Sequence, residues 1–461
     1  MLSHLTPHAS HSPARREPPS TVTTPPPVGY ARTLGLFSAT MMVIGGIIGS
    51  GIFLNPSVVA ARMGSREGTL LVWLLGAVIA LLGAFVFAEL GRRRPLAGGG
   101  YAYLREAFGP LAGFLYGWAL LLIMATGAIA AVAMTFAGYA TDLFGWPVAR
   151  QPLLAAGAIV FLTGLNVVGV KPAAWTQNLF TVLKLLAIAV LVVAAFAAPA
   201  NPVQADAVVA NQGSLLLAVG AALVPVLFAF GGWQQTNFIA EELRDAERDL
   251  PRALLLGVIG VVVAYLLVNV AYLRVLGPAG LAASHAPAAE TMAGIAGESG
   301  RRLIAAGIVA STFGFLNLVI LVSPRVYQAM ARDGLFFKSF ATLHPTWRTP
   351  VAAIVVQGAW AILLLFSGTY GALLDYVVFA DWIFFGLTAA TLFALRRADG
   401  DRVVPFLVPL HPWTTLAFVA AAAYVVLGSL ASNPGNALRG GGLLLLGIPV
   451  FLYWRQRAAT T

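Results

Sequence analysis

Near its N-terminus the chain reads Gly45-Gly46-Ile47-Ile48-Gly49-Ser50-Gly51-Ile52-Phe53, inside an apolar stretch that is long enough to cross a lipid bilayer. A second break, Phe228-Ala229-Phe230-Gly231-Gly232-Trp233, takes the corresponding place in the second half of the chain. In lipid an unpaired backbone N–H or C=O group costs several kcal/mol, so irregular backbone persists there only where protein buries it or where it lines a cavity. Two interrupted helices at matching positions are typical of the binding site of a membrane transporter.

The composition also places the chain in a membrane. Of its 461 residues, 59% are hydrophobic and 10% are charged, whereas soluble domains are about 25% charged. The net charge of +10 comes from lysines and arginines in short loops between apolar runs. This scatter argues against a nucleic-acid-binding surface and fits the positive-inside rule.

The sequence lacks the residues that several other classes of protein function require. The chain has no cysteine, so it can form no thiolate metal site and no disulfide link to a partner subunit. It has neither an HExxH pair nor a GxxxxGK[ST] loop, and no nucleophile with a positioned base stands out in the apolar runs. We therefore expect no enzyme, no metal and no cofactor. The six histidines, expected to be solvated, are His4, His8, His11, His285, His344 and His411.

Twelve apolar runs follow a polar N-terminal tail. Residues 1–30, which include Pro25-Pro26-Pro27, read as a disordered cytoplasmic tail without the apolar core of a signal peptide. Each run is close to the ~20 residues of a spanning helix. The runs are 35–61, 69–91, 110–141, 152–170, 172–198, 214–242, 251–276, 301–331, 350–368, 372–396, 412–431 and 440–456.

The loops between these runs predict the orientation. With the N-terminus inside, lysines and arginines favour the inner side by about three to one, so both termini are expected in the cytoplasm. We expect a multi-pass protein of the cell membrane, either an inner or a plasma membrane.

The two broken helices are the first and sixth spans, which predicts a repeat of five helices. Because five is odd, the second copy must be inverted relative to the first. The expected fold is an all-α integral membrane protein with twelve transmembrane helices in a 5+5 inverted repeat. Its parts are the tail 1–30, a first repeat 31–200, a second repeat 210–400, and helices 11 and 12 at 405–458.

The two breaks carry complementary chemistry. Glycines at Gly49-Ser50-Gly51 free the backbone, and the helix that restarts there offers N–H groups to a carboxylate. The break at Phe230-Gly231-Gly232 frees carbonyl groups that can receive an ammonium group. Together these partners describe an α-amino acid. The alternative is that the glycines only allow close helix packing.

The motifs resemble those of a known family. Besides the first run, they comprise FAFGGWQQTNFIAEELRDAERDLPR at 228–252, Phe87-Ala88-Glu89-Leu90-Gly91, Gly98-Gly99-Gly100-Tyr101-Ala102-Tyr103, SPRVYQAMARDG at 323–334, and Thr349-Pro350. In this order they resemble amino acid permeases of the amino acid–polyamine–organocation superfamily. FAFGGW and a lysine in the fifth helix look closest to the L-type amino acid transporters and their bacterial relatives.

This resemblance implies the predicted fold and assigns roles to the breaks. The substrate carboxylate would meet backbone amides around Gly49, Ser50 and Gly51, and its amino group would meet carbonyls near Ile47 and in the second break. Phe228 would close over the substrate as a gate, unless it only packs in the bundle. The second-break residues that the prediction includes are Phe228, Ala229, Phe230, Gly231 and Gln234.

Lys184 is the only lysine or arginine expected deep in a span. A charge at mid-bilayer costs at least about 2.5 kcal/mol, so it marks a functional site unless the side chain snorkels to the interface. Sodium-coupled relatives hold their ion in this region, so Lys184 is expected to replace sodium, as a fixed cation or as a proton carrier. Ser311 and Thr312 would add oxygens, although Phe315 stands where some relatives carry a small hydroxyl residue.

Asp381 is a second intramembrane charge, at a position where L-type relatives often carry an amide. It can hydrogen-bond within the bundle, bind a proton or favour a cationic substrate. Other candidates for the pocket or the bundle interior are Gln234, Asn237, Trp118, Met124 and Thr126. A charged cluster that can form an ion-pair gate, or merely a solvated loop, comprises Glu241, Glu242, Arg244, Asp245, Glu247, Arg248 and Asp249 together with Glu89, Arg92, Arg93, Arg94 and Arg325.

We therefore expect a secondary transporter that moves an α-amino acid by alternating access without sodium, as an exchanger or a proton symporter. A mostly apolar pocket favours neutral substrates. The alternatives are a permease for polyamines, organocations or cationic amino acids, a channel, and a nutrient sensor built on the same fold.

Overall fold

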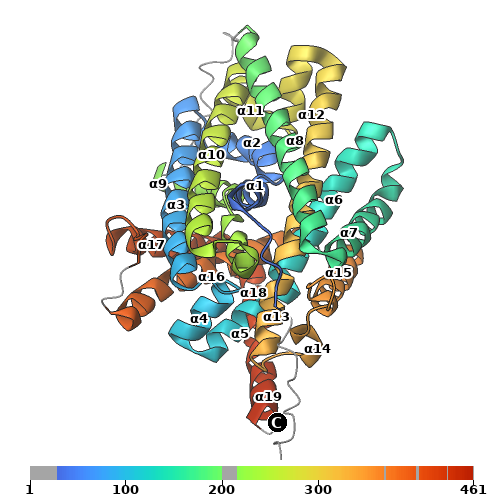
Figure 1. Cartoon of the computed structure of the whole chain (residues 1–461). Coiled ribbons are helices and arrows are strands. Elements are labelled where there is room, and N and C mark those ends of the chain that lie inside the picture. Colours follow the sequence, from blue (N-terminus) through green and yellow to red (C-terminus); the bar gives the residue numbers. More distant parts are fainter. Residues whose placement is uncertain (1–28, 200–214, 368–369, 401–403, 433, 460–461) are drawn as a thin grey trace, which may run out of the picture.

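The computed structural model describes residues 29–199, 215–367, 370–400, 404–432 and 434–459. Almost all of the predicted tail, the linker 200–214 and the short segments 368–369 and 401–403 lie outside the described residues. Within the described ranges the regular elements are helices, and extended pairing is limited to one bridge between Leu34 and Leu243. The expected all-helical fold is thus confirmed (Figure 1).

The helices follow the predicted runs closely. The first half contains α1 (Leu36–Ile47), α2 (Gly51–Met63), α3 (Arg66–Arg93), α4 (Gly100–Phe108), α5 (Pro110–Ala119), η1 (Leu120–Met124), α6 (Ala125–Phe144), η2 (Val148–Arg150), α7 (Gln151–Val168) and α8 (Val170–Ala197). The second half contains α9 (Leu215–Ala229), η4 (Trp233–Glu242), α10 (Ala246–Val275), α11 (Gly277–Ala283), α12 (Pro287–Val322), α13 (Pro324–Arg332), α14 (Lys338–Ala341), α15 (Val351–Phe366) and α16 (Tyr370–Asp399). The C-terminal helices are α17 (Trp413–Ser432), α18 (Pro434–Leu445) and α19 (Gly447–Ala459).

Most of these helices can cross a membrane. Within the described residues, nine stretches of helix are long and apolar enough, and the bent pair α1 and α2 makes a tenth. The helix α15 has only 16 residues, and the last predicted span divides into α18 and α19 at Leu446. A multi-pass membrane protein is confirmed, while the count of twelve spans stays a prediction.

The first broken helix, α1 and α2, lies near the centre of the bundle (Figure 1) and contacts both halves of the second. Their halves pair crosswise: α1 packs against η4, and α2 packs against α9. Two pairs of helices that occupy equivalent positions in the predicted repeat are also in contact: α3 with α10, and α6 with α12. These contacts agree with an inverted second copy, and the two repeats with their boundaries stay predictions.

Each break has a local cause. α1 ends at Ile47 because Ile48 leaves helical geometry, with a ψ of 88°, and α2 restarts at Gly51 with its axis bent by 41°. The second break continues as 3₁₀ helix over Trp233–Glu242, with a kink at Ile239, rather than as α-helix. Its polar side chains compete for backbone groups: the Gln234 Oε1 accepts a hydrogen bond from the Gly232 N–H at 3.1 Å.

The breaks touch backbone to backbone. A Cβ on Gly46 would lie 2.8 Å from the carbonyl oxygen of Gly232, and a Cβ on Gly232 would lie 2.1 Å from the carbonyl oxygen of Gly46. Gly232 also has a φ of +103°. The glycines therefore permit close packing as well as the change of direction at this contact, and their role in binding substrate stays a prediction.

We expect Gly232→Ala to lower the thermal unfolding temperature of the purified protein, because alanine combines a clash with a positive φ that alone costs about 1–3 kcal/mol. The control is Gly260→Ala in α10, where nothing lies within 4 Å of the added methyl group. That change should be neutral or stabilising by up to about 1 kcal/mol. Equal unfolding temperatures for the two variants would contradict the proposed contact.

Candidate functional site

A cavity lies where the two broken helices meet. About 910 Å³ of space, its open mouth included, is free of protein atoms. The predicted site residues that line it are Ile47, Gly49, Ser50, Gly51, Phe228, Ala229, Gly231, Gln234 and Asp381. It is also lined by Gly46, Tyr116, Leu120, Met124, Ala125, Ala128, Val132, Leu227, Gly232, Gln235, Phe238, Phe315, Val319, Ser323, Val377, Val378, Trp382 and Phe385.

One wall of the cavity is the start of α2. The first N–H groups of a helix have no intrahelical acceptor, and the helix dipole is positive there. Ser50 and Gly51 stand at this start and line the cavity. The carbonyl of Ser50 already accepts a hydrogen bond from the Phe53 N–H at 3.1 Å. This geometry can receive a carboxylate, as the sequence predicts.

Another part of the lining is the end of α9, where carbonyl groups are freed. The Tyr265 hydroxyl on α10 lies 3.0 Å from the Ile47 oxygen and 3.2 Å from the Ala229 oxygen, so one side chain bridges both breaks. A carbonyl oxygen has two lone pairs and can accept a second donor. The Ala229 oxygen therefore keeps acceptor capacity for an ammonium group, whereas the Ile47 oxygen already accepts a second hydrogen bond, from the Gly49 N–H at 2.9 Å. Sequence analysis missed Tyr265.

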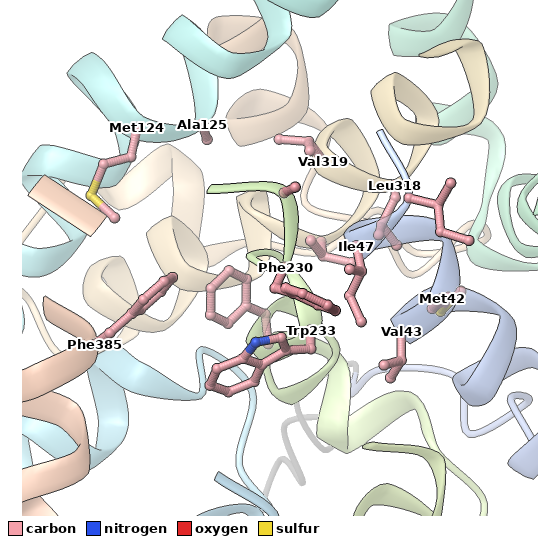
Figure 2. Close-up of a cluster of buried hydrophobic side chains, with 14 of the residues drawn as sticks. Met42, Val43, Ile47, Met124, Ala125, Phe230, Trp233, Leu318, Val319 and Phe385 are labelled. Atoms are coloured by element: carbon pink, nitrogen blue, oxygen red, sulfur yellow. The ribbon is translucent and has the colours of Figure 1, made fainter. Parts of the chain in front are cut away.

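Phe228 and Phe230 lie in different environments. Phe228 lines the cavity and is half-buried. Phe230 is 1% exposed and packs on Trp73 and Tyr265, with ring centroids 5.8 and 5.0 Å away. Figure 2 shows Phe230 and Trp233 between Ile47 on one side and Phe385 on the other. The Phe230 side chain thus belongs to the bundle core, and only its backbone adjoins the predicted site.

Lys184 lies behind the first break. Its side chain is fully buried, and its Nζ donates to the carbonyl oxygens of Gly45 at 3.2 Å and Ile48 at 2.6 Å. The Ser311 hydroxyl, at 3.2 Å, also donates to the Ile48 oxygen. The Thr312 hydroxyl instead bonds the Ile308 carbonyl of its own helix at 2.8 Å. The snorkelling alternative therefore does not describe this lysine.

The remaining predicted candidates separate into one residue that lines the cavity and three that form hydrogen bonds elsewhere in the bundle. Met124 lines the cavity and is the last residue of the π-helix η1, which interrupts the α-helix of the third span. The others bond elsewhere: the Trp118 Nε1 donates to the Leu443 carbonyl at 3.0 Å, and the Thr126 hydroxyl to the Leu121 carbonyl at 2.8 Å. The Asn237 amide donates to the Phe87 carbonyl and the Tyr103 hydroxyl, at 3.0 and 3.2 Å.

Part of the predicted charged cluster forms a buried pair. The Arg325 guanidinium contacts the Glu242 carboxylate at 2.7 Å, and both side chains are almost fully buried. The backbone carbonyl of Glu242 also accepts hydrogen bonds from the N–H groups of Thr33 and Leu34, at 3.0 and 3.1 Å. This contact joins the start of α1, the end of η4 and the start of α13.

Glu89 belongs to a different network. Its carboxylate contacts Arg93 at 2.8 Å and Arg396 at 2.5 Å, and it accepts from the Val408 N–H at 2.6 Å. Asp399 bridges Arg93 and Arg94, at 2.6 and 2.8 Å. The hydrogen bonds that the Arg94 guanidinium donates to the Glu106 carboxylate raise the pKa of Arg94 above its ordinary value. Arg396 and Asp399, which the sequence analysis did not assign, connect α3 to the end of α16.

A bundle of apolar helices around a cavity between two broken helices defines a multi-pass membrane transport protein. The chain belongs to the amino acid permease family, whose model matches residues 34–441. It is 33% identical to the serine/threonine exchanger SteT of Bacillus subtilis (strain 168) over 436 residues, which cover 94% of this chain and 99% of the exchanger.

Two amino acid transporters from animals are similar to this chain to about the same extent. The chain is 32% identical to the b(0,+)-type amino acid transporter 1 of Mus musculus over 409 residues, 87% of this chain and 83% of that protein. It is 31% identical to the large neutral amino acids transporter small subunit 2 of Homo sapiens over 451 residues, 93% and 82% of the two chains. These relatives are transporters rather than enzymes, and the expected amino acid transporter is confirmed.

We expect Tyr265→Phe to lower kcat/KM about tenfold for every substrate, because the phenyl ring leaves the Ala229 carbonyl without a donor, at a cost of about 1–3 kcal/mol, and the Ile47 carbonyl with the Gly49 N–H alone. Uptake of labelled amino acids into proteoliposomes measures the effect. Tyr453→Phe on the exposed face of α19 is the control, expected to transport at the rate of the unchanged protein. A loss confined to one substrate would contradict a role at the common backbone of the site.

Proposed function

We propose that the chain exchanges α-amino acids across the cell membrane by alternating access, without sodium. One observation carries the proposal: the Lys184 ammonium bonds the carbonyls of Gly45 and Ile48 at the unwound end of α1. A fixed ammonium supplies the positive charge and the donors that a bound cation would otherwise give to these oxygens. Likeness to the serine/threonine exchanger supports exchange as the mode of transport.

The cavity suits an amino acid zwitterion. In the proposed pose the substrate carboxylate lies at the first turn of α2, near Ser50 and Gly51, and its ammonium lies at the carbonyls of Ile47 and of residues 228–231. These donors and acceptors come from backbone groups that are already positioned, so little ordering is needed on binding. The substrate side chain points to a largely apolar wall that includes Met124, Val132 and Phe385, which favours neutral amino acids.

The buried pair of Arg325 and Glu242 supports an alternating-access mechanism. It closes the end of the bundle where α1 and η4 meet, and opening that end must break the pair or move it as a unit. By the charge of the loops this end faces the cytoplasm, together with both termini. Phe228 at the cavity is the proposed gate toward the other side.

A proton symporter is the second candidate, because a buried lysine can also carry a proton. The experiment that separates the two uses purified protein in proteoliposomes and labelled alanine, serine or leucine. Uptake that requires an internal amino acid and ignores sodium and the pH gradient supports exchange. Accumulation driven by the pH gradient alone identifies a symporter, and the absence of any amino acid flux contradicts both.

We expect Lys184→Met to reduce exchange at least about tenfold, because the carbonyls of Gly45 and Ile48 lose their charged donor and the unwound end of α1 loses its anchor. The measurement is the initial exchange rate, with thermal unfolding recorded for the same samples. The control Lys171→Met removes an exposed lysine at the start of the same helix and should keep the exchange rate. Equal rates in the two variants would remove Lys184 from the mechanism.

A further inference from the structure

Asp381 is a charged group that the proposed mechanism does not yet use. It lies on α16 and lines the cavity beside Trp382 and Phe385. In the part of the chain that the structure describes, its carboxylate has neither a hydrogen-bond donor nor an ion-pair partner. The cavity lining given by these residues also includes no lysine, arginine or histidine.

The cations nearest to the transport machinery already have partners. Lys184 bonds two carbonyl oxygens behind α1 and does not line the cavity. Arg325 pairs with Glu242, and Arg396 pairs with Glu89. None of these three cations serves Asp381 in the described structure.

A second acceptor lies in the same cavity. Gln235 lines it, and the Oε1 of Gln235 is buried without a hydrogen-bond partner among the described residues. Tyr116, also in the lining, is close enough to Asp381 to interact with it electrostatically. The side-chain region of the cavity thus presents acceptors, a carboxylate and an amide oxygen, to whatever occupies it.

Several other buried polar groups of the bundle have partners within the chain. Gln177, for example, bonds Thr181 at 3.1 Å, and Asn317 bonds the Ala173 carbonyl at 2.9 Å, so each has a partner on a neighbouring turn or helix. A carboxylate kept away from water costs several kcal/mol unless a partner neutralises it. The group that neutralises Asp381, either a proton or a cation, therefore reaches it through the cavity.

We propose that Asp381 is the counter-ion of a cationic substrate side chain, so that the transporter accepts dibasic amino acids in addition to neutral ones. This inference rests on the proposed function, because the α-carboxylate and α-ammonium groups still bind at the two helix breaks. An ammonium or guanidinium group offers three to five donors, which suit the two Asp381 oxygens and the Gln235 Oε1. The zwitterionic backbone adds no net charge, so a side chain of charge +1 neutralises the cavity.

The test compares lysine with norleucine, which has the same carbon chain without the ε-ammonium group. Both compete against exchange of labelled alanine in proteoliposomes of the full chain. We expect lysine to inhibit at least as well as norleucine in the unchanged protein. In Asp381→Asn the lysine-to-norleucine ratio of apparent affinities should fall about tenfold or more, because an amide of similar size keeps the shape and loses the charge.

Two further variants test whether the effect depends on the negative charge at position 381. Asp381→Glu keeps the charge and should retain more of the lysine preference than Asp381→Asn. Asp142→Asn changes the same residue type at the exposed pair with Arg301 and should leave the ratio unaltered. If norleucine competes and lysine does not in the unchanged protein, the inference is overturned while the proposed function stands. An equal loss of both competitors in Asp381→Asn would show a structural role and overturn it too, whereas failure of all exchange would overturn the proposed function itself.

Discussion

The structure depends on how backbone groups freed at the two helix breaks find partners in a region without water. Lys184 serves the carbonyls of Gly45 and Ile48, and Tyr265 serves those of Ile47 and Ala229. The Ile47 and Ile48 oxygens have a second donor each, in the Gly49 N–H and the Ser311 hydroxyl, whereas the Gly45 and Ala229 oxygens would each cost about 1–3 kcal/mol without these side chains. Two side chains from intact helices therefore allow two other helices to stop inside the membrane, and the first turn of α2 can face the cavity.

The same contacts determine which parts move together. The backbone contact between Gly46 and Gly232 joins the two breaks into one unit, and the bonds of Thr33 and Leu34 to the Glu242 carbonyl extend this unit to one end of the bundle. Glu89, in contrast, connects α3 to α16 and to the segment before α17 through Arg396 and Val408. Because a buried ion pair is costly to separate into single charges, movement is expected between these groups rather than within them.

Sequence analysis found the features that lipid makes conspicuous. Glycine pairs and a lysine inside apolar runs cost free energy, so their presence at positions 45–51, 184 and 231–232 was informative by itself. Tyr265 carried no such signal, because a tyrosine in an apolar helix resembles any packing residue and its partners lie 36 and 218 positions away. The π-helix over Leu120–Met124 and the pairing of Glu89 with Arg396 likewise depend on tertiary contacts that no local pattern contains.

The buried charges of the described structure support one general argument about function. Lys184, Arg325, Glu242 and Glu89 each have partners from the chain itself, so their desolvation is compensated in the absence of substrate. Such pairs stabilise or reorganise the bundle and need no ligand. Asp381 faces the cavity without a partner in the described residues, and its cost is compensated only when something enters. A charge left unsatisfied by the protein at the place where substrate binds can select that substrate, because only the correct occupant removes the penalty.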